Sequence, residues 1–209
     1  MKQATGSNAS RFTNKVSIQQ SLDGHSFSVA GLEWILPGGD AVTVEVLTPR
    51  TLLVPAELFD AAEVSELLAS AGMACGEGQR AVWSAPAPVG PKTAAVAVMV
   101  VAAEAAQLID ERLGDRAVFT TPLLEKTTDA HPTVRLELRG GILYIKVFAG
   151  TLRMAETIPA ASEADIRYLI DRLGRAFPLE EMRLLLSGAD ARKMRKLIGS
   201  RFKKVICES

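Results

Sequence analysis

The chain has 209 residues, of which 48% are hydrophobic, and its 24 Lys and Arg balance 24 Asp and Glu. This length allows one large domain or two small ones with an ample core, and a net charge of zero excludes a chain that is basic throughout, as a polyanion binder often is. The two cysteines, Cys75 and Cys207, match no metal or redox spacing, which predicts unpaired thiols in a reducing compartment.

The N-terminal residues 1–14 are polar and contain no apolar core, so they predict a disordered tail rather than a secretory signal. The longest apolar run, residues 93–109, is rich in alanine and is interrupted by Glu104, which makes it too weak for a membrane span. We therefore expect a soluble, cytoplasmic protein with no membrane partner.

Residues 15–133 predict a first α/β half. Asp23-Gly24 separates two strand-like segments and is a strong hairpin signal. The expected strands are, in chain order, residues 16–22, 25–31, 32–36, 41–47, 80–85, 93–100 and 116–122. The expected helical segments are residues 54–72, 102–114 and 123–130, and residues 85–92 are expected to be a proline-rich connector.

Residues 134–209 predict a second half with the order β-β-β-α-β-α-β. Apolar and charged residues alternate from Val134 to Arg139, the period of a half-buried strand, and Gly140-Gly141 suits a two-residue hairpin. Ser162 and Asp165 form the pattern of a capping box at the start of a helix. The expected strands are residues 134–139, 142–149, 152–158, 183–188 and 202–208, with helices at 162–177 and after Asp190.

Both halves are predicted to open with a strand meander and to continue with alternating helices and strands, which indicates an internal duplication. The charge is divided between them. From Val134 onward there are 15 Lys and Arg against 9 Asp and Glu, whereas the preceding residues carry 9 against 15. This complementarity fits halves that dock on each other or that face different partners.

Five stretches together carry a resemblance that covers roughly Lys15 to Glu208. They are VSIQQSLDGHSFSVAG, TLLVPAELFD, FTTPLLE, LRGGILYIKVFAGTLRMAETIP and RLLLSGADAR. This ordered set resembles an uncharacterised bacterial protein family with an actin-like ATPase (ribonuclease H-like) fold. The resemblance implies an α/β protein with actin-like ATPase architecture and two tandem mixed-sheet halves. It implies no activity, because the family has none established.

The resemblance also implies where a nucleotide would bind. In actin-like ATPases one glycine-bearing hairpin in each half surrounds the phosphates, an Asp in the first hairpin helps to hold Mg²⁺, and a glycine turn packs against the adenosine. The matching positions are Asp23, Gly24, Gly140, Gly141, Ser187 and Gly188. The match has departures: Gly24 comes one place early, Arg139 stands where an acid is expected, and Ala189 replaces a glycine.

Three functions are left open. The leading one is a non-catalytic scaffold or protein-interaction module that needs no cofactor and binds an unknown protein partner. The second is a Mg-ATP binding protein or weak ATPase with the nucleotide between the halves. The third is a nucleic-acid-associated protein that uses the basic C-terminal helix. Its anion-binding candidates are Arg192, Lys193, Arg195 and Lys196.

No catalytic residue and no metal site is predicted. The two histidines, His25 and His131, have no second ligand at metal-binding spacing. The segment around Lys92 lacks the spacing of a P-loop.

Overall fold

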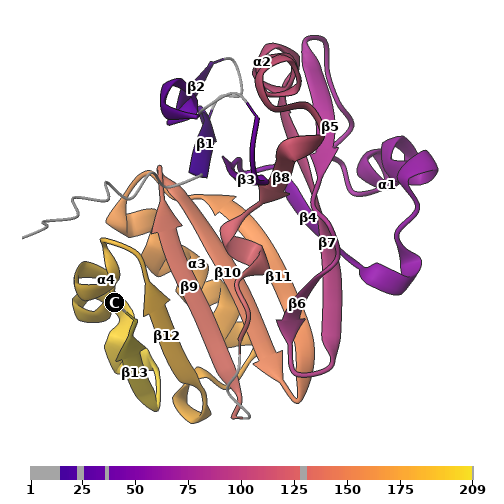
Figure 1. Ribbon diagram of the computed structural model, residues 1–209. Helices are drawn as coiled ribbons and strands as arrows, with labels where there is room; N and C mark the ends of the chain where they lie inside the picture. The colour runs from indigo at the N-terminus through magenta and orange to yellow at the C-terminus, as the bar shows by residue number, and fades with distance from the viewer. Residues whose placement is uncertain (1–14, 23–25, 36–37, 128–130, 209) are drawn as a thin grey trace, which may run out of the picture.

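The computed structural model describes residues 15–22, 26–35, 38–127 and 131–208. In these ranges the chain forms three β-sheets, here called A, B and C, and four α-helices (Figure 1). None of the helices in the described ranges is both long enough and apolar enough to cross a lipid bilayer. The predicted N-terminal tail, residues 1–14, lies outside the described residues.

Sheet A has the strand order β2-β1-β3-β8. Strand β1 (Lys15–Gln20) pairs antiparallel with β2 (Phe27–Ala30) and parallel with β3 (Val42–Leu47), and β3 pairs parallel with β8 (Ala117–Thr120). The predicted meander is therefore wrong for this half, because only β1 and β2 form a hairpin and β3 lies on the other side of β1.

The strand predicted for residues 32–36 is also wrong. Gly31 has a φ of 88°, a left-handed conformation that ends β2 and turns the chain into the short 3-10 helix η1 (Leu32–Trp34). The side chain of Trp34 is 67% exposed, so its large apolar ring does not contribute a buried strand face.

Sheet B is formed by four strands, and its central strand is β7 (Thr93–Ala102). Strands β4 (Thr51–Pro55), β5 (Gln79–Trp83) and β6 (Ala87–Gly90) all pair antiparallel with β7. Alternate side chains of β7 pack into two different cores. Met99 and Val101 pack with sheet A, whereas Val98 and Val100 pack beneath helix α1 (Val64–Ser70).

Two predictions for this region are wrong. Residues 85–92 contain β6 rather than only a connector, since β6 finds its partner in β7 after a short turn. The helix predicted for residues 54–72 is shortened to α1, because β4 extends to Pro55 and two 3-10 helices follow it. These are η2 (Ala56–Leu58) and η3 (Ala61–Glu63), the second of which starts where Asp60 Oδ1 accepts a hydrogen bond from Ala62 N at 2.8 Å.

Helix α2 (Ala103–Leu113) and the short η4 (Gly114–Arg116) return the chain to sheet A. After β8, the 3-10 helix η5 (Pro122–Leu124) stands where a helical piece was predicted for residues 123–130. Residues 128–130 of that prediction lie outside the described residues.

Sheet C follows the predicted element order, which is thereby confirmed. Its strands are β9 (Thr133–Arg139), β10 (Ile142–Ala149), β11 (Thr151–Pro159), β12 (Arg183–Ser187) and β13 (Lys204–Cys207). Their order in the sheet is β11-β10-β9-β12-β13, with β9, β10 and β11 antiparallel and β9, β12 and β13 parallel. The boundary between residues 133 and 134 as a domain limit stays a prediction.

The two faces of sheet C have different roles. Helices α3 (Glu163–Ala176) and α4 (Ala191–Ile198) cover one face, and the first part of the chain lies against the other (Figure 1). Residues of β9 with even numbers, such as Leu136, point into the helix-covered core, and residues with odd numbers point toward the first part of the chain. The core under the helices includes Val134, Leu136, Leu143, Ile145, Ile166, Ile170, Leu184, Leu186, Met194 and Ile198.

The predicted capping box at α3 is confirmed. Ser162 Oγ accepts a hydrogen bond from Asp165 N at 3.2 Å, and Asp165 Oδ2 accepts one from Ser162 N at 2.8 Å. Asp190 precedes α4 as expected, but its side chain makes no capping hydrogen bond.

We expect Ser162→Ala to lower the free energy of unfolding by about 1 kcal/mol, because the backbone N–H of Asp165 loses its acceptor, Ser162 Oγ. Ser162→Thr is the control and is expected to change it far less, since threonine keeps the hydroxyl. Urea denaturation of the three proteins measures the difference. Equal midpoints for the alanine and threonine variants would contradict this role of the hydroxyl.

Candidate functional site

The site is the layer between sheet C and the first part of the chain, and strand β9 supplies its charged side chains. Arg135 and Glu137 are only 6% and 7% exposed. Charged groups removed from water to this extent need oppositely charged or hydrogen-bonding partners. Their partners come from both parts of the chain.

Arg139 connects the two parts of the chain. One of its guanidinium nitrogens lies 2.5 Å from Glu45 on β3 and the other lies 3.1 Å from Glu137 on β9. Lys15 on β1 also pairs with Glu45, at 3.1 Å, and Ser187 Oγ on β12 donates a hydrogen bond to Glu137 at 2.9 Å. We call these five residues the interface network.

The electrostatics of the interface network hold Arg139 in its charged form. Burial disfavours the charge, but the hydrogen bond to Glu137 and the negative charge of Glu45 together outweigh burial, so the pKa of Arg139 is raised. The guanidinium group is therefore a permanent positive charge placed between two carboxylates.

A second buried group of charges lies beside this network. Arg135 pairs with Glu208 at 2.8 Å and with Glu125, whose backbone carbonyl accepts a hydrogen bond from Lys146 Nζ. Lys146 is only 2% exposed. Its burial, with the nearby positive charge of Arg135 as a second cause, lowers the pKa of Lys146 to about 7.

Gly140 and Gly141 form the hairpin turn predicted for them, with φ values of 57° and 75°. The turn packs against the end of β1. A Cβ atom on Gly140 would lie 2.5 Å from Gln19 Nε2, and one on Gly141 would lie 3.2 Å from Leu22 Cδ1. The facing hairpin residues Asp23 and Gly24 lie outside the described residues, so the structure does not test their predicted role.

A cavity of about 640 Å³ opens beside the interface network. Ser187 and Gly188, the predicted adenosine turn, line it together with Arg139, whereas Gly140 and Gly141 do not. The remaining lining residues are Glu125, Arg135, Glu137, Cys207 and Glu208. In the described ranges, no three His, Cys, Asp or Glu side chains are grouped as metal ligands would be.

The anion-binding candidates lie elsewhere. Arg192, Lys193, Arg195 and Lys196 are exposed on α4, which covers the face of sheet C opposite the interface network. Lys193 pairs with Glu163 of α3 at 3.2 Å. Of the four candidates, only Arg192 lines a cavity with a predicted nucleotide position, since it borders a cavity of about 330 Å³ together with Gly188.

Sequence reasoning did not single out Lys15, Glu45, Arg135, Glu137 and Lys146 as site residues. A signal existed for two of them, because Glu45 and Lys146 are charged residues within strands that are otherwise apolar, VTVEVL and ILYIKVFA. A charge inside such a run indicates a buried partner.

No protein-family model matches this chain, and no curated protein matches it in sequence. Among solved structures it is similar to a Bacteroides thetaiotaomicron VPI-5482 protein with an actin-like ATPase fold and unknown function, at a TM-score of 0.66 and 19% identity over 93% of this chain and 90% of that one. A weaker similarity, at a TM-score of 0.39 and 12% identity, covers 82% of this chain and 80% of the cytoplasmic domain of EpsL, an inner membrane component of the Vibrio cholerae type II secretion system.

The chain is thus a mixed α/β protein with an actin-like ATPase fold, as expected from its sequence. Its structural counterpart is a bacterial protein of unknown function, so the likeness defines the fold and assigns no activity.

We expect Arg139→Ala to lower the free energy of unfolding by about 2 kcal/mol, because it leaves the carboxylates of Glu45 and Glu137 half-paired in a buried layer. Their side chains are only 11% and 9% exposed. The control is Arg80→Ala, which removes an ion pair to Asp110 of similar length whose side chains are 44% and 48% exposed, and about 0.5 kcal/mol or less is expected there. Equal losses in chemical denaturation would show that the interface network does not join the two parts of the chain.

We expect the free energy of unfolding to increase with pH between about 7 and about 10 because of Lys146. In this range the lysine is protonated in the unfolded chain and deprotonated in the folded protein, since burial lowers its folded-state pKa to about 7. The slope from this group is about 1.4 kcal/mol per pH unit at most. Below pH 7 both states are protonated and the slope disappears.

The measurement compares urea denaturation of the wild type, Lys146→Met and the exposed control Lys196→Met across this pH range. The difference between wild type and Lys146→Met should change with pH, and the difference between wild type and Lys196→Met should not. If the free energy of unfolding changed with pH in the same way for all three proteins, the lowered pKa of Lys146 would be contradicted.

Proposed function

We propose that this chain is a non-catalytic interaction protein built on an actin-like ATPase fold. The observation that carries the proposal is the Arg139 bridge between Glu45 and Glu137. An ATPase site needs acidic groups there that are free to act through Mg²⁺. Here the acid expected next to the hairpin is replaced by an arginine, and the nearest carboxylates are neutralised by it.

The packing of the second hairpin supports the same proposal. Phosphates bind between two hairpins only when backbone N–H groups face an open space. The end of the Gln19 side chain lies against Gly140, with Nε2 2.5 Å from the place that a Cβ atom would take. The two parts of the chain thus meet where phosphates would have to enter.

We further infer that the two parts arose by internal duplication. In both sheet A and sheet C an antiparallel hairpin lies next to parallel strands, in the orders β2-β1-β3-β8 and β11-β10-β9-β12-β13. The second contains one more antiparallel strand at its edge, and the first has sheet B and α1 inserted between β3 and β8.

One observation favours the second candidate function, Mg-ATP binding. The cavity of about 640 Å³ beside Ser187 and Gly188 has a size typical of small-molecule sites. Its two arginines are already paired with carboxylates, so the cavity offers a polyphosphate little unpaired positive charge. This is why we rank nucleotide binding second.

Calorimetric titration of Mg-ATP tests the proposal, and we expect no saturable heat at nucleotide concentrations up to about 1 mM. Arg139→Asp is the informative variant, because it puts an acid at the position where the fold's ATPases are expected to have one. Binding by this variant but not by the wild type would identify Arg139 as the group that blocks nucleotide.

Saturable binding to the wild type would overturn the proposal if Asp23→Ala or Ser187→Ala abolished it. That result would establish the cleft as a working nucleotide site, and hydrolysis assays would follow.

A further inference from the structure

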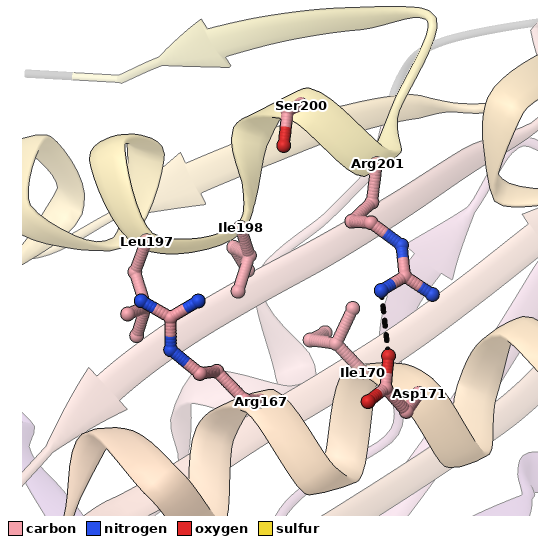
Figure 2. Close-up of a pocket in the computed structure, with 7 residues that line it drawn as sticks. All are labelled: Arg167, Ile170, Asp171, Leu197, Ile198, Ser200 and Arg201. Atoms are coloured by element: carbon pink, nitrogen blue, oxygen red, sulfur yellow. Dashed lines mark hydrogen bonds and ion pairs between the residues drawn. The ribbon is translucent and has the colours of Figure 1, made fainter.

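A groove of about 270 Å³ lies between α3 and the end of α4, on the face remote from the interface network (Figure 2). Leu197 supplies its accessible apolar surface, because Ile170 and Ile198, which also line the groove, are only 1% and 2% exposed. Figure 2 shows Arg167 rising from α3 beside Leu197, and Arg201 reaching from the short η7 (Gly199–Arg201) toward Asp171 of α3, 2.6 Å away.

The charge of this groove is incompletely balanced. In the described part of the chain, Arg167 makes no ion pair and no side-chain hydrogen bond, whereas Arg201 is paired with Asp171. The volume lies below the usual range for small-molecule pockets, so the groove suits a side chain from a docking segment better than a whole cofactor. A partly exposed leucine beside an arginine without an ion-pair partner is complementary to an apolar side chain flanked by carboxylates.

The same chain carries such a segment. Residues 51–79 contain no Lys or Arg and five acidic residues. Leu58 of η2 is 72% exposed and stands between Glu57 and Asp60. The nearby Glu63 and Glu66 are exposed and make no ion pair within the described residues. We call residues 56–66 the acidic segment.

The two features cannot meet within one molecule. Figure 1 shows α1, which follows the acidic segment, and α4, which borders the groove, at opposite sides of the protein. The ion pairs between the two parts of the chain use Glu45, Arg139, Glu125 and Arg135 instead. The outward-facing charges of opposite sign are therefore available to other molecules.

We propose that the groove between α3 and α4 of one copy binds the acidic segment of a second copy, with Leu58 against Leu197 and its flanking carboxylates facing Arg167. The inference rests on the proposed function as an interaction protein and names the partner. Because the two contacting surfaces differ, the contact is head-to-tail and produces rings or open chains rather than a closed two-fold dimer.

A nucleic acid fits this surface less well. Glu163 and Asp171 on α3 alternate with its arginines and would repel a phosphate backbone. Tyr168 is the single aromatic residue of α3, which leaves little to stack on bases.

Sedimentation velocity of the full chain tests the proposal. We expect the sedimentation coefficient to increase with protein concentration between the low micromolar range and about 0.1 mM, and the increase to be suppressed by salt, which screens exposed charges. Arg167→Glu and Leu58→Lys are each expected to weaken association by about tenfold or more. Both residues are exposed, so neither variant should fail to fold.

Two matched controls and one mixture sharpen the test. Arg175→Glu reverses an exposed charge of α3 outside the groove, and Val118→Lys replaces an exposed apolar side chain on β8; neither should alter association. A mixture of Arg167→Glu and Leu58→Lys proteins should associate again, because each variant keeps the surface that the other has lost.

A wild type that stays monomeric at every concentration would overturn the inference, as would association that both variants leave unchanged. Tight binding of a single-stranded oligonucleotide by a monomeric wild type, lost in Arg167→Glu, would assign the groove to nucleic acid instead. A negative result in the sedimentation experiment does not change the expected result of the Mg-ATP titration. The two experiments therefore distinguish a failure of this inference from a failure of the proposed function.

Discussion

The arrangement of the whole molecule depends on the burial of charge on one face of β9. Arg135, Glu137 and Arg139 all point toward the first part of the chain, where Arg135 and Glu137 are almost fully buried and Arg139 is partly buried. Such groups are tolerated only when each meets a partner with suitable geometry. Two of the partners, Glu45 and Glu125, come from the first part of the chain, so satisfying these charges also fixes how the two parts sit on each other.

This constraint is the physical basis of the non-catalytic role that we propose. In an actin-like ATPase the space between the halves must admit a polyanion and a metal ion, which requires uncompensated donors and free carboxylates. In this chain both arginines that line the same space are paired with carboxylates, and Glu137 also accepts a hydrogen bond from Ser187. In the non-catalytic role that we propose, these contacts stabilise the protein itself instead of binding a ligand.

The second part of the chain was predictable because its signals are local. The alternation in β9, the Gly140-Gly141 turn and the Ser162 cap each act within a few residues, and all three are present in the structure. The first part was harder, since β4, β5 and β6 acquire their identity by pairing with β7. Sequence patterns do not reveal which distant strand will be the partner. The last two residues of β4, Val54 and Pro55, were therefore included in a predicted helix.

The same limit applied to the site. Ser187 and Gly188 could be placed near the cleft from the resemblance alone, and they do line its cavity. The contact that matters most joins Arg139 to Glu45, 94 positions apart in the chain. Neither residue carries a motif, and only the packed structure shows that an arginine in an unexpected position is matched by a glutamate in an apolar strand.

The division of the apolar cores has a consequence for cooperativity. The core beneath α3 and α4 draws its buried residues only from Val134 to Phe202, whereas strand β7 contributes to both cores of the first part. Sheet B cannot open without exposing its neighbours, so sheets A and B form a single foldon, and sheet C with its helices forms another. The slowest-exchanging amides should then fall into two groups along the chain. The two groups are coupled through the polar layer between them and through the small apolar cluster of Leu47, Leu123, Ile142 and Tyr144.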